Sequence, residues 1–311
     1  MEFFHSVPRF RFMAQRRICY IISALIVLGS IAAEAVHGLN LAVNFTGGVV
    51  IEAGYANTAD LNATRAALRN VGYPDVAVQN FGSSKDVLVR LPPLGATASA
   101  NEITKKIEAA LATVDPSVQI RRTEIVGPQV GKEPVSKGIT ALAITVLLIL
   151  VYIAFRFRWK FGVGAVLATL HDPFVVIGVF AISGMTFDLS VLAAVLAVIG
   201  YSINETVVVF DRVRELFPVM RKAEPIEVFD RAINETLSRT LITKFATLIV
   251  VVALYLFGGE TLRGFGLALI VGILAVTYSS MYVASGVALD LGSSHRDLMP
   301  SERRAPVDDL P

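Results

Sequence analysis

Long runs of apolar residues, separated by short polar segments, occupy most of this 311-residue chain. An α-helix rises 1.5 Å per residue, so about 20 residues are needed to cross the roughly 30 Å of hydrocarbon in a bilayer. Six runs come close to that length or exceed it, and they cover residues 18–36, 138–155, 161–182, 189–210, 241–257 and 265–289. The pattern therefore predicts an α-helical polytopic membrane protein with six transmembrane helices.

The first run, residues 18–36, fits two interpretations. Arginines precede it and small residues such as Ala32 and Ala35 end it, which is typical of a cleavable signal peptide. The same features suit a membrane anchor that is retained. Taken by themselves, these residues favour neither interpretation.

Basic residues lie in alternate connections between the predicted spans. Because connections rich in Lys and Arg face the cytoplasm, both termini are expected there: residues 1–17 before the first span and a tail over residues 291–311. A five-helix bundle is expected over residues 138–290, with residues 37–137 on the outer side. The basic residues that predict this orientation are Arg9, Arg11, Arg16, Arg17, Arg156, Arg158, Lys160, Arg212, Arg214, Arg221, Lys222, Arg231, Arg239, Arg296, Arg303 and Arg304.

Residues 37–137 have a mixed pattern that predicts a soluble domain. Strands are expected at 49–55, 76–81, 86–91 and 118–126, with helices at 59–71 and from a capping box at Ser99 and Glu102 onward. This β-α-β-β-α-β order predicts a ferredoxin-like α+β domain inserted between the first two spans. Its strand edges would suit pairing with an extended peptide, and a purely structural role fits the order equally well.

The composition, 54% hydrophobic with 17% charged residues, excludes an ordinary soluble globular protein of this size. A net charge of +2 provides no overall field for nucleic acid. The lone cysteine, Cys19, lies in an apolar run and is expected to be a small core residue. The sequence has no phosphate-binding loop, metal-ligand cluster or nucleophile beside a base, so we expect no cofactor, metal site, catalytic residue or enzyme activity. Any energy source would therefore lie outside the chain, either in a partner's ATP or in the membrane gradient.

An ionisable side chain deep in a span is costly unless it is paired or hydrated, which makes such residues functional candidates. His171 and Asp172 lie halfway along the third span, beside Pro173, which leaves a backbone carbonyl one turn earlier without its hydrogen bond. A carboxylate beside an imidazole can transfer a proton near neutral pH. A buried His–Asp pair that holds helices together is the alternative interpretation.

The fourth span contains a polar patch around Glu205, near its cytoplasmic end. We expect Glu205 to carry a proton, with Tyr201, Ser202 and Asn204 as supporting polar groups. The alternative is a glutamate that reaches into interfacial water.

Two basic residues, Arg239 and Lys244, lie at the start of the fifth span and are candidate partners for Glu205. Arginine stays protonated, so Arg239 beside Glu205 would favour the ionised carboxylate and allow proton release. For Lys244 we expect instead that the side chain extends to the interface.

Several stretches, taken together, resemble the protein-export membrane protein SecF family. Residues 44–48, Asn-Phe-Thr-Gly-Gly, are similar to that family's segment after its first span, and residues 126–131 are similar to the entry to its second. Residues 156–172 and 199–212, which contain Asp172 and Glu205, are similar to its third and fourth spans. Residues 236–240, 254–259 and 278–285 are similar to its fifth and sixth spans. Because the likeness runs from the first span to about Leu291, we expect that span to be retained.

The resemblance implies a half-transporter of the resistance-nodulation-division superfamily in the cytoplasmic (inner) membrane. It implies a heterodimer with SecD that works beside the SecYEG channel after SecA has acted, with YajC as a further candidate partner. The clients would be unfolded preproteins, moved at the expense of the proton motive force. The family's proton-carrying carboxylate falls on Glu205, and its fifth-span arginine falls on Arg239.

Three positions depart from the family pattern. Asn44 and Glu205 each replace an aspartate, and Lys244 stands where a small or polar residue is expected. Two rival functions remain open: a small-molecule or lipid exporter of the same superfamily, and a scaffold that steadies a translocase without transporting anything. The first requires a substrate pocket in the outer domain, and the second requires that the buried carboxylates be dispensable.

Overall fold

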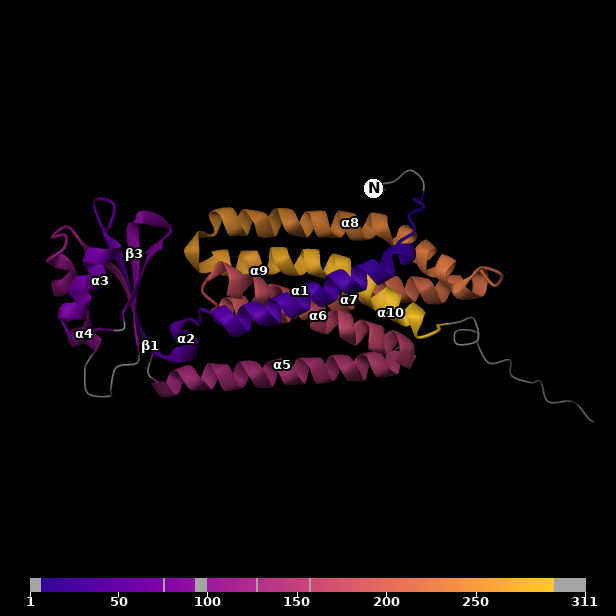
Figure 1. Ribbon diagram of the computed structural model, residues 1–311, viewed down its shortest axis with the longest axis horizontal. Helices are drawn as coiled ribbons and strands as arrows, with labels where there is room; N and C mark the ends of the chain where they lie inside the picture. The colour runs from indigo at the N-terminus through magenta and orange to yellow at the C-terminus, as the bar shows by residue number, and fades with distance from the viewer. Residues whose placement is uncertain (1–6, 75, 93–99, 127, 157, 294–311) are drawn as a thin grey trace, which may run out of the picture.

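Six long helices dominate the computed structural model, which describes residues 7–74, 76–92, 100–126, 128–156 and 158–293 (Figure 1). In these residues, six helices are long and apolar enough to cross a membrane, as the hydrophobic pattern predicted. Their bounds are α1 Arg16–His37, α5 Pro128–Arg156, α6 Trp159–Ser183, α7 Leu189–Val219, α8 Pro225–Phe257 and α9 Gly259–Tyr278. The last helix continues through a π-helical turn, η2 Ser279–Ala284, into α10 Ser285–Asp290, and a short turn, η1 Met13–Gln15, precedes α1.

Two of these helices extend well beyond the predicted apolar runs. α7 has 31 residues and α8 has 33, so each is roughly 47–50 Å long and exceeds the thickness of the hydrocarbon layer. Their extensions lie at the end of the bundle opposite the sheet domain (Figure 1). Phe217 of α7 and Phe229 of α8 are buried there, with ring centroids 6.2 Å apart. The helices continue past the apolar runs because a buried stripe persists on one face after the rest of the surface has become polar.

Glycine residues let the helices approach closely. A Cβ at Gly178 of α6 would lie 2.9 Å from the Cα of Ser30 in α1, and a Cβ at Gly164 would lie 2.4 Å from the carbonyl oxygen of Ala284. α1 therefore packs directly against α6 as part of the bundle.

The sheet domain has the predicted β-α-β-β-α-β order. Its elements are β1 Gly48–Gly54, α3 Leu61–Asn70, β2 Ala77–Phe81, β3 Ser83–Leu91, α4 Ala100–Ala112 and β4 Gln119–Val126, and a short helix, α2 Val43–Thr46, precedes them. The four strands pair antiparallel in the order β2-β3-β1-β4, so β2 and β4 are the edges. The predicted capping residue Ser99 lies outside the described residues, as does the basic tail with Arg296, Arg303 and Arg304.

Alternation along the strands gives the sheet one buried face and one polar face. Ile51 of β1 and Val89 of β3 are fully buried in a core that includes Leu68 of α3 and Ile107 of α4. Both helices cover this face, on the side away from the bundle (Figure 1). The opposite face lies toward the helix bundle.

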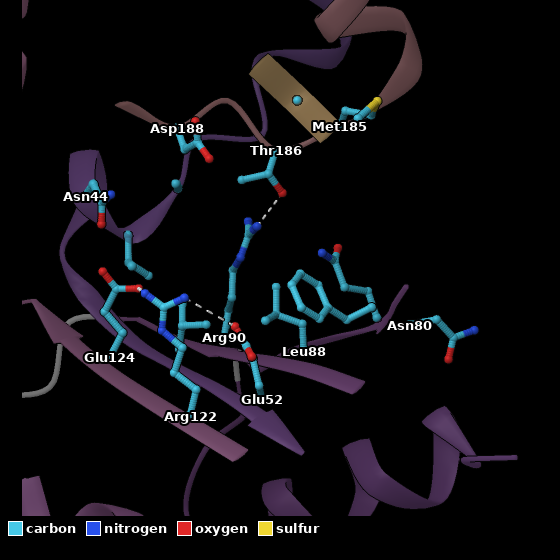
Figure 2. A pocket seen from close by; sticks show the side chains of 17 residues that line it. Asn44, Glu52, Asn80, Leu88, Arg90, Arg122, Glu124, Met185, Thr186 and Asp188 are labelled. Carbon is cyan, nitrogen blue, oxygen red and sulfur yellow. Dashed lines mark hydrogen bonds and ion pairs between the residues drawn. The ribbon is translucent and has the colours of Figure 1, made fainter. Parts of the chain in front are cut away.

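Arg90 of β3 ties the sheet domain to the bundle. Its guanidinium donates a hydrogen bond to Asn40 Oδ1 at 2.7 Å. It donates another to Thr186 Oγ1, in the α6–α7 connection, at 2.5 Å (Figure 2). Burial lowers the pKa of Arg90, and the nearby carboxylate of Asp188 opposes that shift. A groove of about 310 Å³ lies beside Arg90, and opposite charges such as Arg122 and Glu124 line it. The sheet domain therefore rests on the bundle through a polar junction.

Candidate functional site in the helix bundle

Four ionisable side chains are buried among three helices of the bundle. Asp172 is 0% exposed, His171 6%, Glu205 7% and Lys244 3%. Depth can be counted at 1.5 Å per residue from the end of each helix that lies nearest the sheet domain. Asp172 lies roughly 16 Å from that end of α6, Lys244 about 20 Å from that end of α8, and Glu205 about 24 Å from that end of α7. These depths place all of them within the thickness of a bilayer, where an unpaired charge is costly.

The Asp172 carboxylate is held by groups from three helical segments. Its Oδ2 accepts hydrogen bonds from Ser202 Oγ of α7 at 2.6 Å and from Ser279 Oγ at 2.9 Å. Its Oδ1 lies 3.0 Å from Nδ1 of the neighbouring His171. Hydrogen bonds to an ionised oxygen are stronger than those between neutral groups, so this arrangement stabilises a buried carboxylate without a direct cation.

Ser279 reaches Asp172 from the first residue of the π-helical turn η2. A π-turn inserts an extra residue into the helix and changes the direction in which the following side chains point, and such turns are frequent at functional sites. Ser279 was not predicted as a site residue, because the serines at 279 and 280 carry no sequence signal of a π-turn.

One imidazole nitrogen of His171 has a polar partner and the other has none among the described residues. Nδ1 faces Asp172, while Nε2 is buried and has no hydrogen-bond partner among the described residues. The ring lies beside that of Tyr278, with centroids 6.1 Å apart, and the Tyr278 hydroxyl donates to the Cys19 carbonyl at 2.6 Å. α1 therefore contributes to the surroundings of this pair, and Cys19 is the buried core residue that was expected.

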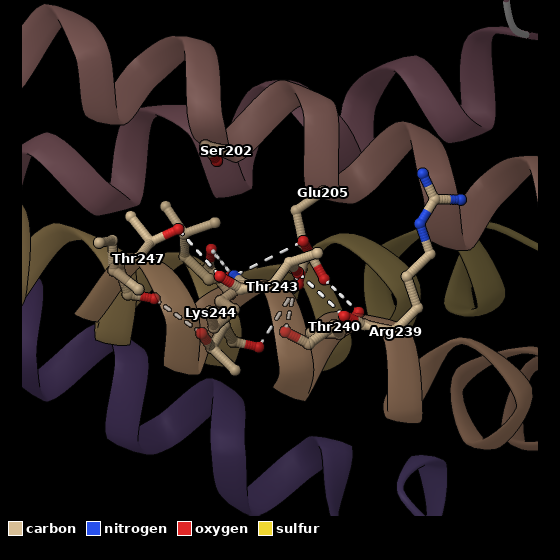
Figure 3. A network of polar contacts seen from close by, with 12 residues as sticks. Ser202, Glu205, Arg239, Thr240, Thr243, Lys244 and Thr247 are labelled. Carbon is tan, nitrogen blue, oxygen red and sulfur yellow. Dashed lines mark hydrogen bonds and ion pairs between the residues drawn. The ribbon is translucent and has the colours of Figure 1, made fainter. Parts of the chain in front are cut away.

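Glu205 is held by α8 (Figure 3). Thr240 Oγ1 donates to Glu205 Oε1 at 2.7 Å, and Lys244 Nζ lies 3.7 Å from Glu205 Oε2. Thr240 and Lys244 are four residues apart and share one face of α8, as i and i+4 positions do. Thr240 was not identified from the sequence, although this spacing relative to Lys244 was a signal that could have found it.

The structure reverses the expected order of the two basic candidates. Lys244 is buried beside Glu205, so the expectation that its side chain extends to the interface is wrong. Arg239 is exposed, and no described residue forms an ion pair with it. Figure 3 shows its guanidinium apart from the Glu205 carboxylate. Arg239 precedes Thr240 by one residue, which rotates it by about 100° away from the face that contacts α7.

Of the three polar residues of α7 that were expected to support Glu205, two lie at the site and one is exposed. Ser202 and Tyr201, three and four residues before Glu205, lie on its face: Ser202 bonds Asp172, and the Tyr201 ring centroid is 5.3 Å from Lys244 Nζ. Asn204 is exposed and makes no described side-chain hydrogen bond. The site therefore contains two groups of polar contacts, one around Asp172 and one around Glu205, and α7 contributes Ser202 to the first and Glu205 to the second.

The chemistry available at this site is proton exchange and charge pairing. Two carboxylates, one imidazole and one ammonium lie in an apolar interior, where a change in the protonation of one group alters the energy of its neighbours. Within the described residues, no group of three or more His, Cys, Asp or Glu could hold a metal ion.

Comparison with known proteins identifies the family. Residues 106–294 match the family described as protein export membrane protein SecD/SecF, C-terminal. The chain is 42% identical over 308 residues to the protein translocase subunit SecF of Pseudomonas aeruginosa, covering 98% of this chain and 99% of that protein. This chain belongs to the SecF family. The SecF of Vibrio alginolyticus is also 42% identical, over 96% of both chains.

Solved structures of SecDF have the same architecture. The crystal structure of SecDF from Thermus thermophilus, titled a translocon-associated membrane protein, matches with a TM-score of 0.83 and 34% identity over 91% of this chain. SecDF in a super-membrane-facing form matches with a TM-score of 0.69 and 34% identity over 93% of this chain. This chain spans 39% of the length of each solved SecDF chain. The resemblance to SecF in the sequence is confirmed, and the chain is a multi-pass inner-membrane component of protein transport.

Two positions that depart from the family pattern lie in contact with each other. Glu205 was expected to be aspartate and Lys244 a small or polar residue, and the two side chains form the ion pair described above.

Proposed function

We propose that this SecF-family chain couples the proton motive force to a late step of preprotein translocation, in a heterodimer with SecD. Preproteins would reach it after SecA and the SecYEG channel have acted, and YajC is a further candidate partner. The observation that carries the proposal is the buried network of Asp172 and Glu205, because such carboxylates are costly in a membrane unless they have a function.

Glu205 is the proton carrier in this proposal. Among the described residues, its carboxylate forms a hydrogen bond with Thr240 and an ion pair with Lys244, both of α8, so a change in its charge acts directly on the α7–α8 contact. A group that changes its interactions with protonation can shift a conformational equilibrium by the difference in those interactions. His171 and Asp172 form the second station, linked to α7 through Ser202.

Arg239 remains in the proposed pathway as a residue near its cytoplasmic end. It is exposed in this conformation, one residue before Thr240, and a helix rotation of about 100° would turn it toward the face that Glu205 contacts. Arg239 would then favour release of the proton from Glu205. Asn204 is exposed and has no role in the conformation described.

The outer domain would transmit the motion to the client. We assign residues 37–137 to a ferredoxin-like domain on the outer side, with residues 1–17 and 291–311 in the cytoplasm and a five-helix bundle over 138–290. The sheet order β2-β3-β1-β4 supports this assignment. Arg90 bonds Thr186 in the α6–α7 connection directly, and it bonds Asn40, whose side chain donates to the Gly184 carbonyl of the same connection. A movement of that connection would therefore change how the domain contacts the bundle. A preprotein segment gripped there would be kept from sliding back.

The test is export driven by an imposed proton gradient in inner-membrane vesicles that contain the Glu205→Gln variant. Gln keeps the size of the side chain and cannot ionise, so the gradient-dependent part of export is expected to fall at least about tenfold. Glu227→Gln, the same chemical change at an exposed position of α8, should leave export unchanged.

Full gradient-dependent export by Glu205→Gln would refute the proton role and favour a scaffold. The exporter alternative would be favoured if the purified chain carried no SecD and if gradient-dependent flux of a small molecule survived without the export channel. Co-purification in mild detergent separates these outcomes.

A further inference from the structure

The residues before α1, 7–13, form an N-terminal strap that is fastened to α8. The amide of Phe10 donates to Oδ1 of the buried Asn234 at 3.0 Å, and the carbonyl of Phe10 accepts from Nδ2 of the same side chain at 2.8 Å. The amide of Met13 donates to Asp230 Oδ1 at 2.8 Å, and the Met13 side chain is 0% exposed. Because the strap is fixed at two points, its remaining side chains are held in place before any partner binds them.

Three arginines of the strap and of the start of α1 are exposed: Arg9, Arg11 and Arg17. None of the three forms an ion pair with a described residue, whereas the neighbouring Arg16 pairs with Asp290 of α10 at 2.9 Å. A guanidinium has five hydrogen-bond donors in a planar fork, which matches the oxygens of a phosphate. These three side chains are therefore available to an anionic partner outside the described structure.

The acidic side chains that lie beside the strap are already engaged. Asp230 of α8 accepts a backbone hydrogen bond from the strap and interacts electrostatically with Arg11 and Arg16. Asp290 pairs with Arg16 and accepts a hydrogen bond from the Tyr20 hydroxyl at 3.0 Å. Two carboxylates thus face four arginines, and this surface carries an excess of positive charge.

An apolar surface continues directly from these arginines. Ile18, Ile21 and Leu25 of α1 are 62%, 63% and 64% exposed and follow one face of the helix, a stripe that is suited to the hydrocarbon of a bilayer. Arg17 is on the same face as Ile21, four residues away, and ends the stripe. The Phe10 side chain, 55% exposed, adds an apolar group between two of the arginines. Basic groups beside exposed apolar groups are typical of a surface that binds at the membrane interface.

The strap also lies at the appropriate depth. Asn234, which holds it, precedes the apolar run of α8 at Leu241 by seven residues, or roughly 10 Å. The headgroup layer on each side of a bilayer is about 5–8 Å thick. The strap is at the end of the bundle opposite the sheet domain (Figure 1). It therefore crosses α8 near the outer boundary of the headgroup layer.

We propose that the N-terminal strap and the first turn of α1 bind anionic phospholipid. Arg9, Arg11 and Arg17 contact the phosphates, while Phe10 and the apolar stripe of α1 contact the acyl chains. The excess positive charge selects lipids with a net negative headgroup over zwitterionic ones, since both kinds offer a phosphate and only the former leaves it uncompensated. A lipid bound there bridges the strap and α1, which strengthens the attachment of α1 to α8. This site is separate from the buried carboxylates and does not depend on the proton role of Glu205.

The experiment measures lipid binding to the purified full chain in a nonionic detergent by native mass spectrometry. Dioctanoyl phosphatidylglycerol is the anionic probe and dioctanoyl phosphatidylcholine the zwitterionic one. Each arginine near an anionic surface changes affinity by roughly fivefold, so Arg9→Gln/Arg11→Gln/Arg17→Gln is expected to bind phosphatidylglycerol at least about tenfold more weakly, with little change for phosphatidylcholine. The corresponding triple change to Lys keeps the charge and should retain most of the preference for the anionic lipid. The matched control is Arg69→Gln/Lys85→Gln/Lys105→Gln, which removes three exposed charges from the sheet domain and should leave binding unchanged.

Four results would overturn the proposal. The unaltered chain would bind both lipids equally, the strap variant would keep its affinity for phosphatidylglycerol, or the sheet-domain control would lose as much affinity as the strap variant. Displacement of the lipid by glycerol 3-phosphate would show that a free phosphate suffices and that the apolar contacts contribute nothing. Unchanged lipid binding by a strap variant that loses a co-purifying protein would likewise contradict the lipid assignment and favour an acidic protein surface as the partner.

Discussion

The contact between α1 and α6 can be tested by adding one methyl group at Gly178. A Cβ at this position would lie 2.1 Å from Ser30 Oγ, 2.4 Å from Ser30 Cβ and 2.9 Å from Ser30 Cα. Ordinary carbon contacts are about 3.5–4.0 Å, so Gly178→Ala creates an overlap with each of these atoms. Rotation of the serine side chain removes only the overlap with Oγ, and the two helices must therefore separate by roughly 1 Å.

Overpacking of this kind costs about 1–3 kcal/mol, which corresponds to roughly a 5- to 150-fold change in the unfolding equilibrium. The free energy of unfolding can be measured by titrating a denaturing detergent into the protein in mild detergent and following helical circular dichroism. Gly29→Ala is the matched control, because Gly29 is the neighbour of Ser30 in α1 and a Cβ there has no atom within 4 Å. That control is expected to be neutral or stabilising by up to about 1 kcal/mol, as replacement of a helical glycine usually is.

A second-site change sharpens the test. Ser30→Gly removes Cβ and Oγ but leaves Cα at 2.9 Å from the new methyl group, so the double variant Ser30→Gly/Gly178→Ala should recover part of the loss and not all of it. If Gly178→Ala were as stable as Gly29→Ala within about 0.5 kcal/mol, the close approach of α1 and α6 described here would be incorrect.

Three further changes test the sheet domain and the α6–α7 connection that it contacts. Arg90→Leu removes the hydrogen bonds to Asn40 and Thr186. The amide of Ala42, which donates to the Phe187 carbonyl nearby, should then exchange at least about tenfold faster in hydrogen exchange by mass spectrometry. Asp60→Ala removes the acceptor for two backbone amides at the start of α3 and should lower the free energy of unfolding by about 0.5–2 kcal/mol, whereas Asp60→Asn should not. Asp188→Ala removes the cap of α7 and should cost about 1 kcal/mol, with faster exchange confined to the first turn of that helix.

Most of the fold follows from patterns that are local in the sequence. The six apolar runs predict six helices because a bilayer sets the minimum length of a span. The strands and helices of residues 48–126 could be predicted because apolar residues recur with the period of a strand or of a helix, and this period indicates the buried face of each element. The continuation of α7 and α8 beyond the apolar runs does not follow, because Phe217 and Phe229 become a buried stripe only when the two helices pack together.

The carboxylates of the candidate site were predicted and their partners were not, because the partners depend on how each helix is rotated about its axis. Asp172 and Glu205 could be predicted because a carboxylate in an apolar run stands out whatever its neighbours are. Their partners could not be predicted, because successive residues of a helix are rotated by about 100° about its axis. A small error in the assumed rotation of the helix therefore places a different side chain beside the carboxylate. Arg239 was expected beside Glu205, and the structure places Lys244 there instead.

Sequence alone thus determined which segments are long and apolar enough to span a membrane and which of their residues are unusually polar, since both properties belong to single segments and depend on hydrophobicity and length. Tertiary structure decided which polar groups meet. Ser202 and Ser279 reach Asp172 from α7 and from a π-turn far along the chain, and Thr240 reaches Glu205 from α8. These contacts depend on the relative rotation and depth of separate helices, which packing of their surfaces determines and no single segment encodes.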